Sequence, residues 1–119
     1  MKIQTAPLLL ALTVMPLGAT FACDAPVAPP SADGGSATLE EMIAAQGEVK
    51  AFQAANAEYL ECVDNQMSAE QASIDEGDES AKERYALAAA DYNAAVSREE
   101  QVAADFNSAI KAYKAANPD

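Results

Sequence analysis

The chain has 119 residues, with 19 acidic and 7 basic side chains and no histidine or tryptophan. This length corresponds to one domain. The net charge of −12 argues against a nucleic-acid-binding surface, because affinity for phosphates depends largely on Lys and Arg. Without histidine there is no Ser/His/Asp or Cys/His constellation, and the commonest ligand of catalytic transition metals is missing. We therefore expect no enzyme, no cofactor and no metal site.

The hydrophobic fraction of 50% overstates the material available for a core. Alanine supplies 29 positions, and five of the eight leucines lie within the first 17 residues. Residues 23–119 hold 19 bulky apolar side chains, counting Leu, Ile, Val, Met, Phe and Tyr. The sequence therefore predicts a thin core.

Residues 1–22 have the pattern of a secretory signal peptide. Lys2 precedes an apolar run at 8–19, and the small residues Thr20 and Ala22 stand at positions −3 and −1 of a cut after Ala22. The run is shorter than the roughly 20 residues that span a bilayer, and no later segment is as apolar. We expect export, residence in the periplasm and no transmembrane segment after signal removal. The loss of Lys2 with the signal peptide changes the net charge to −13.

Cys23 directly follows this cut, and the chain has one other cysteine, Cys62. In an oxidising compartment two cysteines form the smallest disulfide framework. With a helix starting near Leu39, Cys62 lies roughly 35 Å along it at 1.5 Å per residue, and residues 24–38 span up to about 47 Å as polyproline helix. A Cys23–Cys62 disulfide is therefore within reach. The alternative is a lipoprotein tethered through Cys23, although Thr20 departs from the usual lipid-attachment pattern.

Residues 23–37 are rich in Pro, Gly, Ser and Asp and have no helical or strand period. This composition predicts an extended arm and not a domain. Pro26, Pro29 and Pro30 would keep the arm extended and lower the entropy that it loses on docking. We expect the arm to run back along the first helix, antiparallel to it.

The first helix is expected at about 38–73. Thr38 and Glu41 form a capping-box pattern at its start. Heptad spacing creates two columns that face a partner helix. One column holds Met42, Val49, Asn56 and Val63, and the other holds Ala45, Phe52, Tyr59 and Gln66. Asn56 and Gln66 are polar interruptions in the lower half of this stripe.

An acidic turn is expected at about 74–79 and a second helix at about 80–116, with Asp78 or Ser80 as its N-cap. The acidic residues of the turn could collect calcium, but they lack the spacing of a calcium loop, and the composition is typical of an exposed turn. One heptad column of the second helix is aromatic and is broken by Glu99. It holds Tyr85, Tyr92, Phe106 and Tyr113, beside a column of Ala88, Ala95, Val102 and Ala109.

These elements predict an all-α fold: a long antiparallel two-helix hairpin, residues 38–117, with the proline-rich arm stapled to helix 1 by the disulfide. The hairpin would be roughly 50 Å long. The arm would act as a third layer, and self-association into a four-helix assembly is the main alternative source of burial. An aromatic seam is the candidate interaction surface, either as the packing contact of the hairpin or as a groove for an apolar ligand or client peptide. It comprises Phe52, Tyr59, Tyr85, Tyr92, Phe106 and Tyr113.

The mature chain resembles an uncharacterised family of small, alanine-rich secreted or periplasmic helical proteins of proteobacteria. The segments that carry the likeness are Asp33-Gly34, Thr38-Leu39-Glu40-Glu41-Met42, Ala45-Gln46, Val49-Lys50, Tyr59-Leu60-Glu61-Cys62, Tyr92-Asn93-Ala94-Ala95-Val96, Phe106-Asn107 and Tyr113-Lys114. In the arm, Ser31-Ala32-Asp33-Gly34 stands where an Ile-Pro-Asp-Gly string is usual. The resemblance implies a periplasmic helical protein of unknown role and transfers no catalytic or binding residue.

Three functional hypotheses follow from the sequence. The first is a non-enzymatic envelope protein with a structural or protein-interaction role, which acts through a protein partner or by self-association. The second is a periplasmic chaperone-like protein that binds basic or unfolded clients on its acidic, tyrosine-edged face. The third is the membrane-tethered lipoprotein anchored through Cys23.

Overall fold

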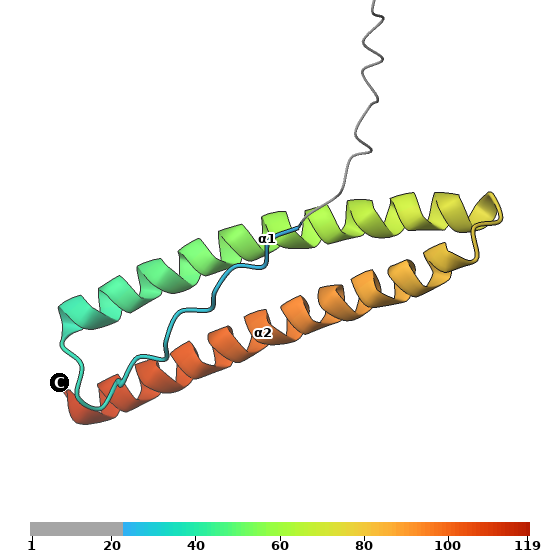
Figure 1. The fold of residues 1–119 in the computed structure, drawn as a ribbon. Coiled ribbons are helices and arrows are strands. Elements are labelled where there is room, and N and C mark those ends of the chain that lie inside the picture. The colour runs from blue at the N-terminus through green and yellow to red at the C-terminus, as the bar shows by residue number, and fades with distance from the viewer. Residues whose placement is uncertain (1–22) are drawn as a thin grey trace, which may run out of the picture.

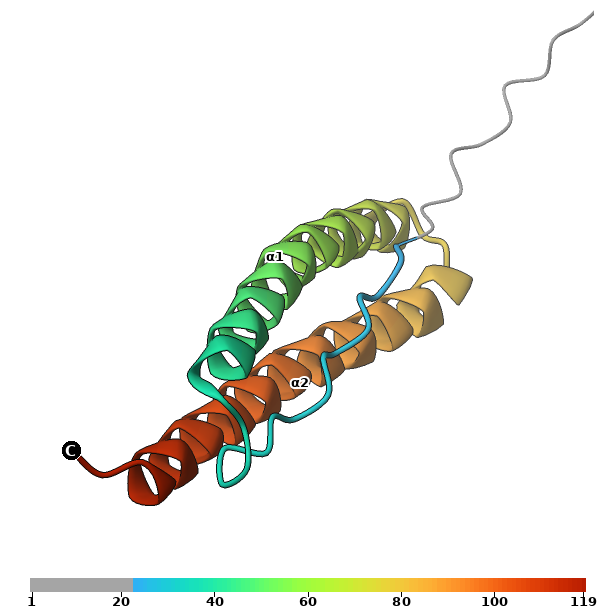
Figure 2. The same cartoon turned by 90° about the vertical axis from the view of Figure 1, so that its left-hand side faces the viewer.

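The structure is a computed structural model that describes residues 23–119, so the predicted signal peptide lies outside the described residues. Two helices of 37 residues each, α1 (Leu39–Asp75) and α2 (Ser80–Ala116), form an antiparallel hairpin. The arm, residues 23–37, crosses from the middle of α1 to the C-terminal half of α2 (Figures 1 and 2). The all-α hairpin with its stapled arm is confirmed.

The first turn of α1 is closed by the predicted capping box. The backbone N–H of Glu41 donates to Oγ1 of Thr38 at 3.1 Å, and the backbone N–H of Thr38 donates to Oε2 of Glu41 at 2.8 Å. Two backbone donors that a helix start leaves unpaired are thereby satisfied. The arm therefore leads into α1 at a defined residue.

Gly77 ends α1 in a Schellman motif. The N–H of Gly77 donates to the carbonyl of Ile74 at 3.0 Å, and the N–H of Asp78 donates to the carbonyl of Ser73 at 3.0 Å. Gly77 has φ +95°, a left-handed conformation that glycine adopts without steric cost. Because this motif satisfies the last carbonyls of the helix, α1 continues to Asp75, two residues beyond the expected end.

Asp78 organises the start of α2. Its Oδ1 accepts hydrogen bonds from the backbone N–H of Ser80 at 3.0 Å and from the Ser80 hydroxyl at 2.6 Å, while the N-cap residue Glu79 makes no capping side-chain bond. Arg84 donates to Asp78 at 3.0 Å and to Glu70 on α1 at 2.9 Å. The hydrogen bond from Ser80 and then that from Arg84 lower the pKa of Asp78. Of the two expected caps, Asp78 supplies the acceptor.

The core is one seam between the helices. In α2 every seventh residue is buried, and this column holds Ala81, Ala88, Ala95, Val102 and Ala109. In α1 the buried side chains are larger, and they are Met42, Phe52, Asn56 and Val63. Small residues on one helix let the axes approach, so the larger side chains of the other helix fill the space. Val63 and Asn56 are the largest side chains that are almost completely buried, which agrees with the thin core expected from composition.

Neither helix within residues 23–119 has a stretch long and apolar enough to cross a membrane.

Candidate functional site

The arm covers the interhelical groove in the half of the hairpin away from the turn. It begins at the disulfide between Cys23 and Cys62, whose Cα atoms are 5.8 Å apart and which encloses a sequence separation of 39 residues. The arm then crosses onto α2 before it returns to the start of α1 (Figure 2). The predicted disulfide is confirmed. The arm runs opposite to α1 as expected, but it also leans across onto α2, because its last residues pack against that helix.

Gly34 lies directly against the backbone of α2. It is the one buried residue of the arm, and a Cβ atom placed on it would lie 1.8 Å from the carbonyl oxygen of Ala109. Real Cβ atoms do not come this close to backbone, so a larger residue would push the arm away. Gly35 has no such neighbour, since its Cβ would meet only a side-chain oxygen of Asp33 at 3.5 Å.

A compact turn presents Gly34 to the helix. The carbonyl of Asp33 accepts hydrogen bonds from the N–H groups of Ser36 at 3.2 Å and Ala37 at 2.8 Å. The Asp33 carboxylate also accepts from the N–H of Gly35 at 3.2 Å. An aspartate that binds the backbone two residues on is typical of tight turns. Asp33-Gly34, which the resemblance highlighted, is therefore a docking element with a physical reason for both residue types.

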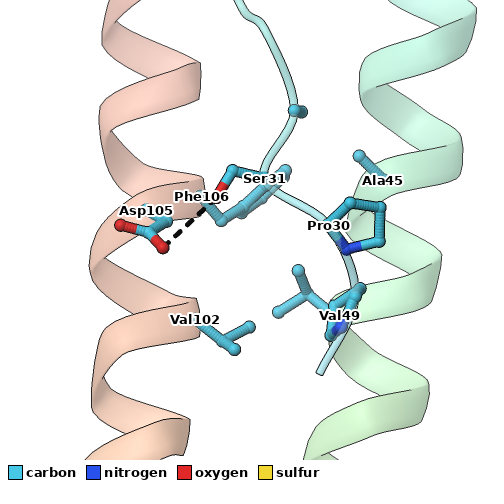
Figure 3. A pocket seen from close by; sticks show the side chains of 9 residues that line it. Pro30, Ser31, Ala45, Val49, Val102, Asp105 and Phe106 are labelled. Carbon is cyan, nitrogen blue, oxygen red and sulfur yellow. Dashed lines mark hydrogen bonds between the residues drawn. The ribbon is translucent and has the colours of Figure 1, made fainter. Parts of the chain in front are cut away.

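The central part of the arm lies between the two helices and leaves little space beneath it. Ser31 donates a hydrogen bond from Oγ to Oδ2 of Asp105 at 3.2 Å, as Figure 3 shows. A residual cavity of about 10 Å³ remains beneath the arm, which is room for about one water molecule. Arm residues and both helices line it, and the lining residues are Pro29, Pro30, Ser31, Ala32, Ala45, Val49, Val102, Asp105 and Phe106. Open depressions of about 460 Å³ and 300 Å³ lie beside the docked arm, the first against α1 and the second against α2.

The six residues of the predicted aromatic seam do not form one site. Phe52 is buried in the core, and the other five are half-buried. Phe106 lines the cavity beneath the arm and also an open depression at the end of the hairpin, where Tyr113 joins it. Tyr85 lines a separate surface depression with Met67 near the turn. The heptad pattern predicted that these rings lie along the seam, but it did not predict that Tyr85 and Tyr113 line separate depressions at opposite ends of the hairpin.

An apolar surface remains uncovered at the end of the hairpin away from the turn. It surrounds a depression of about 240 Å³, and we call it the open-end patch. Its residues are Leu39, Met42, Ile43, Gln46, Phe106, Ile110, Tyr113 and Lys114. Leu39 and Ile43 are 59% and 60% exposed, which is high for aliphatic residues that lie side by side on one helix turn. Sequence periodicity gave no signal for this patch, because its members occupy several heptad positions.

A buried polar contact interrupts the seam at its centre. Asn56 is fully buried, and its Nδ2 donates to the carbonyl of Ala95 and to Oε2 of Glu99, both at 3.2 Å. Its Oδ1 has no hydrogen-bond partner within residues 23–119. Asn56, the polar interruption of the α1 stripe, is thus hydrogen-bonded to Glu99, the residue that interrupts the aromatic column of α2. A polar residue at such a position specifies helix register at some cost in stability.

The acidic turn is organised by its own neighbours and not by a cation-ligand cluster. In the part of the chain that the structure describes, no group of three His, Cys, Asp or Glu side chains is placed to hold a metal ion.

Comparison with known proteins adds no relative: no protein-family model, no curated protein and no solved structure matches this chain.

Proposed function

We propose that this protein is a non-enzymatic envelope protein that braces or binds a protein partner through the open-end patch. The observation that carries the proposal is the exposure of Leu39 and Ile43 beside the ring of Phe106, at the end of a strapped hairpin. Contiguous exposed apolar surface is typical of interaction sites. The disulfide supports an extracytoplasmic location, because disulfides persist in oxidising compartments.

The chemistry of the chain favours a basic partner over a second copy. Residues 23–119 carry a net charge of −13, so two copies repel each other while a positively charged protein is attracted at low ionic strength. A lipid tether at Cys23 would need the same Sγ atom that forms the disulfide, so the tethered and stapled forms exclude each other. Our proposal is for the disulfide-linked form.

The experiment compares two substitutions by cross-linking in the envelope. Ile43→Glu places a charge in the open-end patch, and Leu87→Glu is the matched control because Leu87 is equally exposed, at 62%, but lies outside the patch. We expect Ile43→Glu to abolish a cross-linked protein adduct that the wild type and Leu87→Glu both form. Equal adducts in all three proteins would contradict the proposal, and a homodimer would indicate self-association instead.

A chaperone-like role is the second candidate, favoured by the same patch within an acidic surface. It predicts that the protein suppresses aggregation of a basic client at low salt and loses this effect at high salt, because screening weakens charge attraction. The chaperone-like role would be contradicted if Ile43→Glu left the suppression of client aggregation unchanged, or if the protein suppressed no aggregation at any salt concentration.

A further inference from the structure

The surface between the two helices accommodates an extended segment, the arm of the same chain. This segment, residues 24–37, has no secondary structure except the turn at 34–36. Grooves between helices that accept a preformed polyproline segment bind it without a large loss of conformational entropy. Here the segment belongs to the same chain, and it runs from α1 to α2 (Figures 1 and 2).

Apart from its covalent end, the arm is held by packing and by few hydrogen bonds. Between the arm and the helices, residues 23–119 provide a single side-chain hydrogen bond, from Ser31 to the partly exposed Asp105. Val27 is 92% exposed, and Gly34 is the one arm residue that is buried. The Cys23–Cys62 link adds to this packing, because it keeps the arm at a high effective concentration over the groove.

We propose that the groove beneath the arm is a binding site for an extended, proline-rich peptide of another protein, which residues 24–37 occupy in cis and which reduction of Cys23–Cys62 opens. Arm release exposes apolar groove residues from both helices, namely Ala45, Val49, Val102 and Phe106. Both cysteines are partly exposed in the structure, so a reductant can approach the bond.

The reductant is a dithiol. One of its thiolates attacks a sulfur of the Cys23–Cys62 bond and forms a mixed disulfide, and its second thiolate displaces the bound cysteine. The dithiol is oxidised to a disulfide. Its two electrons and two protons pass to Cys23 and Cys62, which become free thiols. The arm then remains covalently attached to the hairpin only through Thr38, and its competition with another peptide is weaker.

The docked arm defines what the peptide must contain. Two adjacent prolines contact the groove, as Pro29 and Pro30 do, and a following hydroxyl can donate to Asp105. Three residues after that hydroxyl a glycine is required, because any Cβ meets the Ala109 carbonyl.

This inference rests on the interaction role proposed above but uses a different surface, so the two can fail separately. Ile43 lines the open-end patch and not the groove. Ile43→Glu is therefore expected to leave peptide binding unchanged while it abolishes the envelope adduct.

The test uses residues 23–119 with Cys23→Ser, Cys62→Ser and Gly34→Ala, so that the chain's own arm can neither be linked nor dock. The probe is a fluorescent peptide of residues 24–37, and the readout is fluorescence anisotropy. We expect saturable binding, at least tenfold weaker for a peptide carrying Gly34→Ala than for one carrying Gly35→Ala. A receptor with Gly35→Ala in place of Gly34→Ala should bind more weakly, because its own arm still competes.

Three results would overturn the proposal: no saturable binding, equal binding of the two glycine-substituted peptides, or a reversible dimer of the Cys23→Ser/Cys62→Ser chain, which would make a second copy the occupant. If circular dichroism shows that the triple variant has lost its helices, the wild-type chain is compared before and after treatment with dithiothreitol. Peptide binding that appears on reduction supports the proposal, and binding that is absent or equal in both states overturns it.

Discussion

The two halves of the hairpin are held together in different ways. The strapped half comprises the arm, α1 up to Cys62 and α2 from Ala95 onward, and it is stabilised by a disulfide and by the docking of Gly34. The turn half comprises residues 63–94 and has neither. It depends on the Schellman motif at Gly77 and on the contacts that Arg84 makes with Glu70 and Asp78.

Sequence separation explains this difference. The turn half pairs residues that are close in the chain, such as Glu70 and Arg84, which are 14 residues apart. In the strapped half, Ser31 and Asp105 are 74 residues apart. The entropy lost on closing a loop rises with its length, so helix ends far from the turn fray first. A covalent strap is therefore most effective where the structure has it.

Removal of the disulfide should produce the largest effect. For Cys23→Ser/Cys62→Ser we expect the free energy of unfolding to fall by about 3 to 4 kcal/mol, because the denatured chain regains the conformational entropy that the cross-link had removed. Urea denaturation measures the total, and hydrogen exchange locates it. Protection should fall in the strapped half and persist at residues 63–74, whereas uniform loss along both helices would show that the two halves are not separate.

Gly34→Ala should weaken the strapped half without touching the disulfide. The added Cβ collides with the backbone of Ala109, and such overpacking costs about 1 to 3 kcal/mol. Gly35→Ala is the matched control and should change stability by no more than about 0.5 kcal/mol. Thermal denaturation of the oxidised proteins distinguishes the two. Equal effects would mean that the close approach of Gly34 does not hold the arm.

The fold was predictable because its signals are local. Thr38 and Glu41 mark a helix start, the composition around Gly77 marks a turn, and heptad columns mark the facing sides. The disulfide followed from the reach of the arm. Each of these inferences needs a few neighbouring residues or one distance.

The contacts of the arm were not predictable for the opposite reason. That Gly34 packs on Ala109 depends on where the arm crosses onto α2, which no periodic pattern encodes. Asn56 and Glu99 were each visible as an interruption of a stripe, but their pairing depends on the relative register of the two helices. The open-end patch likewise depends on which side of the seam the arm leaves uncovered.

Substitutions of Gly77 and Gly47 test whether the Schellman motif stabilises the turn half. Gly77→Ala should destabilise the protein by about 1 kcal/mol or slightly more, because an L-residue at φ +95° is strained. Gly47→Ala should stabilise it by roughly 0.5 to 1 kcal/mol, since Gly47 lies within α1 and a Cβ there meets nothing within 4 Å. Urea denaturation measures both. If Gly77→Ala were as stable as Gly47→Ala, the Schellman motif would not support the turn half.

The smallest effect is a dependence on pH at Asp78. Its pKa is lowered in the folded protein, chiefly by the hydrogen bond from Ser80 and then by that from Arg84. A lowered pKa means that the folded state binds the proton less tightly than the unfolded state. The carboxylate therefore stabilises the fold above the unfolded pKa of about 3.9 and loses this effect as the pH falls through the folded pKa.

Asp78→Asn tests this dependence, because the amide nitrogen cannot accept a hydrogen bond from Arg84. Asp91→Asn, at an exposed position of α2, corrects for the change in net charge. Near neutral pH the Asp78→Asn protein should be the less stable of the two variants, and hydrogen exchange should place the loss in the turn half. In acid the two variants should converge, because Asp78 of the control is then protonated as well. A difference that stayed constant across the titration would mean that the charge of Asp78 does not stabilise the turn, which would then depend on the backbone at Gly77 and on the contact between Arg84 and Glu70.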